Sequence, residues 1–473
     1  MAPPRSRCMI DLKALRNDPE HFRKGAEAKG TAVQIDELLE LDAKKRALLS
    51  EMEQARAEQK KLAKETGPRM GQLKGALKKA SDEERPALEQ ELATLEAQPA
   101  ALKRRVQQAE TAIAEIEPIL EEFLLTIPQP PAADVVVGPD ASANVERRRW
   151  SLGFEPGQSF ASQRGFAPKT HLELIEQHDL VDFARGVKMS GSRHYVLKGD
   201  GMRLHEAVLR MALEMMTETH GFTPMSVPVI VREECMVGTG FFPGGREQAY
   251  HVAEKERGGG HDMFLTGTGE VGLMGVYADE ILDLNQLPVT ATTRSTCFRR
   301  EAGAAGRDTA GLYRIHQFDK VEQVVIHAAD AEEHQAWHKK MMGFVEGFLQ
   351  ALELPYRLLD CCTGDLGQKN EAMTDIECWM PGRGELDAEG RPSGDWGETH
   401  SASRLSDFQT RRLNLRYRDT EGKIRFPYAL NNTVAASPRL LIPILEIHQQ
   451  ADGRIRIPEA LQPYMNGRAF LGG

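Results

Sequence analysis

The sequence predicts an α+β protein, in which a long antiparallel helical hairpin precedes a domain built around a mainly antiparallel sheet. The first quarter of the 473 residues carries a heptad pattern with little glycine and few aromatic residues. Glycine, proline, histidine and strand-like runs fill the rest of the chain. These strand-like runs do not alternate regularly with helical ones, which argues against a doubly wound parallel sheet.

Composition excludes several classes of protein. Apolar residues make up 41% and charged residues 27% of the chain, as in folded domains. No apolar run reaches the roughly 18–20 residues that a membrane helix needs. The net charge of −10 means that a nucleic acid must meet a local basic patch. The six cysteines lack zinc-ligand or CxxC spacing, so we expect reduced thiols and a cytoplasmic location.

The helical hairpin is predicted over about residues 34–126. Leucine or alanine recurs every seven residues from Leu41 to Leu62, and apolar residues follow a 4/3 step from Leu88 to Leu120. Such a seam keeps one apolar stripe of a helix facing a partner helix. At 1.5 Å of rise per residue, we expect helices that project roughly 45–65 Å.

Local signals add detail to the hairpin. Ser81 and Glu84 have capping-box spacing for the start of the second helix. Four prolines should each kink or interrupt a helix, so we expect a bent or segmented arm. These prolines are Pro68, Pro86, Pro99 and Pro118. The proline-rich run at 127–131 ends the arm and begins a linker.

The stretch from Lys60 to Lys79, near the turn of the hairpin, contains seven basic residues and a single acidic one, Glu65. A solvated helical face is one interpretation. The other is a nucleic-acid-binding tip, because clustered lysine and arginine supply most sequence-independent affinity for phosphates. A basic distal end on an acidic chain favours the second interpretation. The residues are Lys60, Lys61, Lys64, Arg69, Lys74, Lys78 and Lys79.

Two charged clusters that flank a glycine-rich turn predict a β-hairpin with a binding loop. They run from Phe298 to Gly303 and from His316 to Glu322, with Gly306–Asp308 between them. Arginines supply planar donors for carboxylate and phosphate oxygens, and Phe318 offers a face to a flat base. A hairpin laced with surface salt bridges is the alternative. The GxGxxG run at 267–272 lacks the later acidic residue of a dinucleotide site, which disfavours a Rossmann fold.

The charged hairpin closely resembles the second signature motif of the seryl-tRNA synthetases, a family of class II aminoacyl-tRNA synthetases. His220–Pro228, after a helical run from Leu204, resembles the first motif, and Leu430–Leu440 resembles the third. The helical hairpin lies where the family carries its tRNA-binding arm. The resemblance covers essentially the whole chain. It implies an N-terminal tRNA-binding domain at 1–127, a linker and lead-in at 128–170, and a class II catalytic domain at 171–473.

The resemblance implies an activity. Members of the family activate serine with ATP to give seryl-adenylate, and then transfer serine to the 3′ end of tRNA(Ser). We keep tRNA(Sec) as a second candidate acceptor. ATP as a substrate, Mg²⁺ as the metal and a homodimer formed through the first motif are also implied. Two other functions stay open: a ligase that loads an amino acid onto a carrier protein, and a catalytically silent paralogue that binds tRNA.

The resemblance places a serine pocket at five positions. Thr268, Gly269 and Glu270 match the family's serine-binding loop, and Glu322 and Thr433 would complete the pocket. A site built to hydrogen-bond a hydroxyl rejects the analogue that lacks it, because its polar groups are then left unpaired. The spelling Gly-Thr-Gly-Glu here replaces the more usual Pro-Thr-Ser-Glu, which we expect to loosen the loop.

The resemblance also places an ATP site. Arg299 would bridge the serine carboxylate and the α-phosphate, Arg439 would bind the γ-phosphate region, and Phe318 would stack on adenine. Arg299, Glu301 and Arg439 are the expected catalytic residues. The full set of expected ATP contacts is Arg299, Arg300, Glu301, Phe318, Glu398, Thr399, His400, Ser401 and Arg439.

A metal site is expected within the same set. Glu398 and Ser401 offer the hard oxygen ligands that suit Mg²⁺. The chain has Glu-Thr-His-Ser here, where family members usually have Glu-Ile-Ser-Ser or Glu-Val-Ser-Ser. We expect His400 to face solvent or to lie behind the ATP contacts. The alternative is a histidine whose ionisation makes ATP affinity depend on pH.

Overall fold

The computed structural model describes residues 9–253, 261–302, 311–388 and 390–472. Most of the turn of the predicted charged hairpin, including Gly306–Asp308, lies outside these residues. The chain divides into two compact units. One unit comprises Lys13–Pro19 and Ala32–Ile127, and the other comprises the residues up to Leu12, Glu20–Thr31 and Pro128–Gly473.

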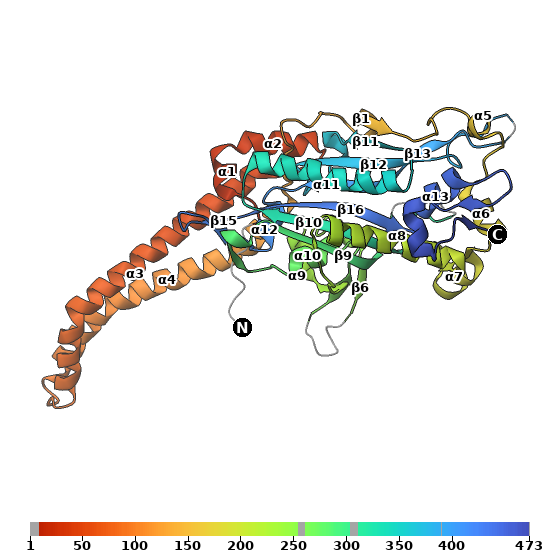
Figure 1. Ribbon diagram of the computed structural model, residues 1–473. Coiled ribbons are helices and arrows are strands. Elements are labelled where there is room, and N and C mark those ends of the chain that lie inside the picture. Colours follow the sequence, from red (N-terminus) through yellow and green to blue (C-terminus); the bar gives the residue numbers. More distant parts are fainter. Residues whose placement is uncertain (1–8, 254–260, 303–310, 389, 473) are drawn as a thin grey trace. The chain divides into compact units, whose positions relative to one another are not determined.

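The first unit is the predicted hairpin, formed by α3 (Ile35–Leu77) and α4 (Arg85–Thr126). The two helices lie side by side along their length (Figure 1). The predicted seam is buried between them, as at Ala55 of α3 and at Ala109 and Ile116 of α4. The heptad pattern therefore forms an antiparallel coiled coil.

Of the two outcomes expected from the prolines, a bent arm or a segmented one, the structure shows a bent arm with continuous helices. Pro68 lies inside α3, and Pro99 and Pro118 lie inside α4, without ending either helix. Each proline removes one backbone hydrogen bond, and both helices curve instead of breaking (Figure 1). Pro86 lies in the first turn of α4, where its missing N–H is not needed.

The turn of the hairpin keeps the predicted polar pair but shifts the start of α4. The Glu84 carboxylate accepts hydrogen bonds from the Ser81 backbone N–H at 3.2 Å and from the Ser81 hydroxyl at 2.9 Å. The helix nevertheless begins only at Arg85. Ser81 therefore closes a separate turn ahead of the helix.

The second unit is built on an eight-stranded sheet in the order β1-β11-β12-β13-β16-β10-β9-β4. Neighbouring strands run antiparallel, except that β4 pairs in parallel with β9, which confirms the predicted fold class. The strands are β1 (Val145–Trp150), β4 (Thr223–Pro224), β9 (Val289–Phe298), β10 (Gln317–His327), β11 (Tyr356–Asp360), β12 (Ala372–Met380), β13 (Asp395–Arg404) and β16 (Tyr428–Ser437).

Three helices, α8 (Asp200–Glu214), α11 (Ala331–Ala351) and α13 (Leu441–His448), share one large core with this sheet (Figure 1). Val321 and Val325 of β10 point into that core. Successive side chains of a strand alternate between faces. The even-numbered residues of β10, from Phe318 to Ile326, therefore point to the opposite face, where the candidate site lies.

Smaller elements surround the sheet. The remaining helices are α1 (Leu12–Asn17), α2 (Pro19–Ala28), α5 (Phe160–Arg164), α6 (His171–Gln177), α7 (Phe183–Ser190), α9 (Glu233–Gly238), α10 (Glu270–Gly275) and α12 (Phe408–Arg412). The remaining strands are β2 (Val181–Asp182), β3 (Val196–Leu197), β5 (Ile230–Arg232), β6 (Tyr250–Val252), β7 (Met263–Leu265), β8 (Ile281–Asp283), β14 (Arg416–Arg418), β15 (Ile424–Arg425), β17 (Ile455–Arg456) and β18 (Phe470–Leu471). Among the helices described, none is both long and apolar enough to cross a bilayer.

Candidate active site

A cavity of about 340 Å³ opens on the face of the sheet opposite the large core. Its size suits a small-molecule site. Twelve of the residues predicted from the sequence line it together: Thr268, Glu270, Arg299, Glu301, Phe318, Glu322, Glu398, Thr399, His400, Ser401, Thr433 and Arg439. A second cavity of about 520 Å³ shares Arg299, Glu301, Glu398 and Arg439 with the first.

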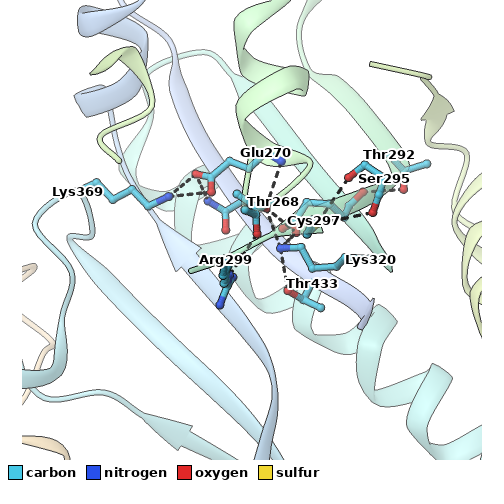
Figure 2. A network of polar contacts seen from close by, with 12 residues as sticks. Thr268, Glu270, Thr292, Ser295, Cys297, Arg299, Lys320, Lys369 and Thr433 are labelled. Carbon is cyan, nitrogen blue, oxygen red and sulfur yellow. Dashed lines mark hydrogen bonds and ion pairs between the residues drawn. The ribbon is translucent and has the colours of Figure 1, made fainter. Parts of the chain in front are cut away.

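Strand β10 supplies the floor of the cavity. Phe318, Lys320 and Glu322 alternate along the strand, so all three side chains reach the same face. Thr433 lies opposite Glu322 on the neighbouring strand β16. Thr268 arrives from the loop before α10, and its hydroxyl donates to Glu322 Oε2 at 3.1 Å (Figure 2).

Lys320 and Glu322 form a buried ion pair at this floor. The exposed fractions are 6% for Lys320 and 1% for Glu322. Burial raises the pKa of Glu322, and the ammonium of Lys320 opposes that rise. Lys320 Nζ also donates to Thr268 Oγ1 at 2.8 Å. The sequence interpretation missed this lysine, although its place two residues before Glu322 on a strand was a usable signal.

Glu270 lies in a second polar cluster, beside the first (Figure 2). Lys369 Nζ lies 2.6 Å from Glu270 Oε1 and 2.7 Å from Oε2. The side-chain amides of Gln409 and Asn431 each donate to Glu270 Oε1 at 2.6 Å. These three partners were missed because they come from separate stretches of sequence that meet only in the fold.

Gly269 packs tightly against β9. A Cβ atom at this position would lie 2.5 Å from Thr293 Cγ2 and 3.0 Å from Ser295 Oγ. The expectation that glycine loosens the loop is therefore wrong, because the missing side chain lets the loop approach the strand. This approach brings Thr268 and Glu270 to the cavity.

The end of β9 carries the predicted arginines. The guanidinium of Arg299 lies 5.3 Å from the centre of the Phe318 ring, and its Nε donates to the Gly267 carbonyl at 3.3 Å. Glu301 accepts a hydrogen bond from Arg314 Nη1 at 2.9 Å. Among the described residues, those lining the two cavities include Arg299 and Glu301 but not Arg300.

Arg439 closes the open side of the cavity next to Glu398. Its Nη1 donates to the Glu398 carbonyl at 3.1 Å, and its guanidinium lies 4.5 Å from the centre of the Tyr313 ring. The Glu398 side chain remains 48% exposed. A cation and an exposed carboxylate thus meet at the solvent end of the site.

A bulge in β13 shapes the stretch from Glu398 to Ser401. In the pairing with β12, His400 lies opposite Ile376 and Glu398 opposite Glu377, so Thr399 is the extra residue. An extra residue shifts the alternation of side chains by one. The bulge therefore lets Glu398 and Ser401, three positions apart, face the same cavity.

His400 does not face solvent, which corrects that part of the expectation. Its side chain is 1% exposed, and its Nε2 donates to the Val434 carbonyl at 3.1 Å. Desolvation by burial lowers the pKa of His400 to about 3. The imidazole is therefore neutral near pH 7, which contradicts the alternative of a pH-sensitive ATP contact at that pH.

All seven basic residues predicted on the arm are exposed, but α4 offsets their charge. Arg69 pairs with Glu91 and Lys74 with Glu96, each at 2.7 Å across the hairpin. The stretch 80–100 carries one arginine and six acidic residues: Asp82, Glu83, Glu84, Glu89, Glu91 and Glu96. The arm end therefore carries acidic residues in the turn and at the start of α4 beside the basic residues, and is not basic all round as α3 alone suggested.

A mainly antiparallel sheet that gathers the second and third sequence motifs around one polar cavity defines a class II aminoacyl-tRNA synthetase. The family model described as "tRNA synthetase class II core domain (G, H, P, S and T)" matches residues 250–448. The model described as "Seryl-tRNA synthetase N-terminal domain" matches residues 9–131. The chain belongs to the seryl-tRNA synthetase family, and it is a ligase that forms an aminoacyl-tRNA from serine.

Relatives span the whole chain. The serine–tRNA ligase of Deinococcus radiodurans is 41% identical over 98% of this chain and 99% of its own length. That of Thermomicrobium roseum is 38% identical over 98% of this chain and 95% of its own length. The crystal structure of seryl-tRNA synthetase from Pyrococcus horikoshii complexed with ATP superposes with a TM-score of 0.82 at 34% identity, covering 98% of this chain and 99% of that chain.

Proposed function

We propose that the cavity binds serine at its buried end and ATP at its open end, and joins them as seryl-adenylate. The observation that carries this proposal is that different charged groups lie at the two ends of the cavity. Two buried carboxylates, Glu270 and Glu322, lie at one end, and Arg439 lies at the other, with Arg299 lining the same cavity. This order matches an amino acid whose ammonium enters first and whose carboxylate meets the nucleotide phosphates.

The serine pocket comprises Thr268, Glu270, Glu322 and Thr433, with Gly269 allowing the loop to pack. The carboxylates suit the ammonium group, and the two threonine hydroxyls suit the serine hydroxyl. Buried polar groups left unpaired by a smaller amino acid are costly. Such a pocket rejects alanine for want of a hydroxyl.

The ATP site comprises the residues around the open end. Arg299 bridges the serine carboxylate and the α-phosphate, and Arg439 binds the γ-phosphate region. Phe318 offers adenine a flat face, which Arg299 covers at 5.3 Å in this structure. The remaining proposed contacts are Arg300, Glu301, Thr399, His400 and Ser401.

The oxygen atoms of Glu398 and Ser401 fit Mg²⁺. The Glu398 carboxylate is exposed, and the bulge in β13 lets Glu398 and Ser401 face the same cavity. A metal ion that also contacts substrate phosphates needs ligands placed in this way. Mg²⁺ is usually held by one or two carboxylates together with substrate phosphates. When bound, it supplies neutralisation of phosphate charge. Glu398 and Ser401 would hold it.

The proposed chemistry has two steps. The serine carboxylate attacks the α-phosphorus of ATP in line, the bond to the β-phosphate oxygen breaks, and pyrophosphate leaves. The terminal ribose hydroxyl of tRNA(Ser) then attacks the carbonyl of the mixed anhydride and releases AMP. No protein nucleophile takes part, so Arg299, Glu301 and Arg439 act by positioning and by stabilising charge.

We propose that successive regions of the chain have different functions. An N-terminal domain at 1–127 binds tRNA through its arm, residues 128–170 link it, and residues 171–473 catalyse both steps. Basic residues exposed on α3 and on the turn after it support phosphate contact. They are Lys60, Lys61, Lys64, Arg69, Lys74, Lys78 and Lys79. We also propose a two-fold homodimer through the stretch His220–Pro228 and α8.

We propose a cytoplasmic location. None of the five cysteines among the described residues forms a disulfide. Reduced thiols are the usual state in the cytosol.

The test is charging of total tRNA by the purified full chain with ATP, Mg²⁺ and each labelled amino acid in turn. We expect label from serine alone, on tRNA(Ser). Purified tRNA(Sec) in the same assay tests the second acceptor. Serine-dependent pyrophosphate exchange without transfer to any tRNA would indicate a carrier-protein ligase, and no exchange at all would indicate a silent paralogue.

A further inference from the structure

The buried end of the cavity holds two carboxylates and two ammonium groups. Glu322 is paired with Lys320, and Glu270 is paired with Lys369. The proposed serine site accounts for both carboxylates, whereas Lys369 has no role in it. The Lys369 ammonium also lies 4.1 Å from the centre of the Phe241 ring, so it is enclosed by a carboxylate and an aromatic face.

Hydrogen bonds to its backbone carbonyls fix the segment that carries Lys369. Lys29 Nζ donates to the carbonyls of Gly367 at 3.0 Å and of Asn370 at 2.6 Å. The backbone N–H of Gln129 donates to the Gln368 carbonyl at 2.8 Å. Both residues flanking Lys369 are therefore fixed, which keeps its ammonium at Glu270.

Glu270 has little capacity left for another donor. Oε1 accepts from Lys369, Gln409 and Asn431, and Oε2 accepts from Lys369. A carboxylate offers about four lone-pair sites in all. Four donor contacts reach this one, and its charge is matched by the Lys369 ammonium.

We propose that Lys369 is a specificity-determining residue of the amino-acid pocket. By neutralising Glu270, it leaves this carboxylate without an uncompensated charge for a second substrate ammonium, whereas a neutral hydroxyl needs none. A substrate with a second ammonium in place of the hydroxyl would add an unpaired buried charge, which is costly. This inference rests on the proposed serine site.

The test compares serine with L-2,3-diaminopropionate, which carries an amino group where serine carries its hydroxyl. Amino-acid-dependent ATP–pyrophosphate exchange by the full chain gives kcat/KM for each. The wild-type protein should reject diaminopropionate. In K369M, the uncompensated Glu270 carboxylate should accept its side-chain ammonium, and the ratio of diaminopropionate to serine kcat/KM should rise at least about tenfold.

Three further variants make the result specific. K369R keeps the charge and should keep the rejection. K369M/E270Q removes both charges and should lose the gain seen in K369M. K369Q is a second neutral variant, should K369M fail to fold. A merely structural lysine would lower exchange with both amino acids without changing their ratio.

An unchanged ratio in a folded K369M or K369Q would overturn the inference, and so would a gain that persists in K369M/E270Q. Wild-type exchange with serine separates the two proposals. If serine supports no exchange in the wild type, the proposed function fails first. If serine supports exchange and the ratio does not move, only the role of Lys369 fails.

Discussion

Lys320 and Glu322 reach the same cavity from alternate positions of β10, and their side chains form an ion pair at its buried end. The pair is nearly closed to solvent, so each charge depends on the other. Removing one partner of a buried pair leaves a charge without compensation, at a cost of about 3–5 kcal/mol. In the proposed serine site, Lys320 therefore fixes the position of the carboxylate that the substrate ammonium would meet.

Glu322→Gln tests this arrangement. The variant keeps the shape of the side chain, removes the charge that suits the serine ammonium and leaves Lys320 uncompensated. We expect kcat/KM for serine to fall roughly 100-fold or more, mainly through KM for serine. Serine-dependent ATP–pyrophosphate exchange measures this, with KM for ATP from the same assay.

Its control is Glu332→Gln, at an exposed glutamate in the first turn of α11. This variant should leave both KM values unchanged. Binding of tRNA(Ser) should be equal in all three proteins. An unchanged KM for serine in a folded Glu322→Gln protein would remove Glu322 from the pocket.

The sequence predicted most of the residues that line the cavity, but it did not predict the lysines that balance the charges of Glu270 and Glu322. The charged hairpin predicts Phe318 as a face for a flat base, and the family resemblance implies the role of Glu322. The alternation of side chains along β10 would also have revealed Lys320. Lys369 and Gln409 reach Glu270 only through the fold, because no local pattern pairs residues about 100 or more positions apart. Propensity alone likewise could not decide whether Pro68 bends or ends its helix, since packing along the α3–α4 seam keeps the helix continuous.

His400 should make stability, not ATP binding, depend on pH. Its pKa is about 3 in the folded chain and about 6.5 when unfolded, so the unfolded state binds the proton first. Its contribution to stability is present above about pH 6.5 and is lost as pH falls toward 3. Thermal unfolding from about pH 7.5 to about pH 5 should show a steeper loss for wild type than for His400→Gln.

The comparison with His400→Gln isolates this residue from other histidines with lowered pKa values, such as His338 and His448. KM for ATP should stay flat between about pH 6.5 and about pH 8, because the ring remains neutral there. If KM for ATP rises as pH falls within this range, and His400→Gln abolishes the rise, then the histidine ionises in the site.

Shortening the arm should separate the two steps. We would delete Lys60–Arg105 and join Gln59 to Val106 through a short glycine–serine turn. The Arg56–Glu110 ion pair places these ends near one another across the hairpin. Charging of tRNA(Ser) should be lost, while serine-dependent pyrophosphate exchange stays near the wild-type value. Loss of exchange as well would mean that the arm is not a separable tRNA-binding element.

Charge on α3 should matter more than net charge at the arm end. Among the described residues, Lys60 and Lys64 have no ion-pair partner, so both are available to phosphates. K60E/K64E should raise KM for tRNA(Ser) about tenfold or more and flatten its dependence on salt. K423E, on an exposed turn of the second unit, is the matched control. Equal effects of the two variants would contradict an α3 binding face.

Gly269→Ala should displace the serine loop. The new Cβ would lie 2.5 Å from Thr293 Cγ2, closer than real contacts allow. Overpacking of this kind costs about 1–3 kcal/mol, and the displaced loop carries Thr268 and Glu270. We expect KM for serine in pyrophosphate exchange to rise about tenfold or more, with a smaller effect on KM for ATP.

Thr293→Ser provides the rescue, because it removes the methyl group that the new Cβ would strike. The double variant Gly269→Ala/Thr293→Ser should recover most of the serine affinity, giving a favourable coupling energy in a double-mutant cycle. Gly71→Ala on α3 is the control, since nothing lies within 4 Å of its added Cβ. If Gly269→Ala keeps the wild-type KM for serine, close packing on Thr293 does not position the loop. The same follows if the double variant does not recover serine affinity.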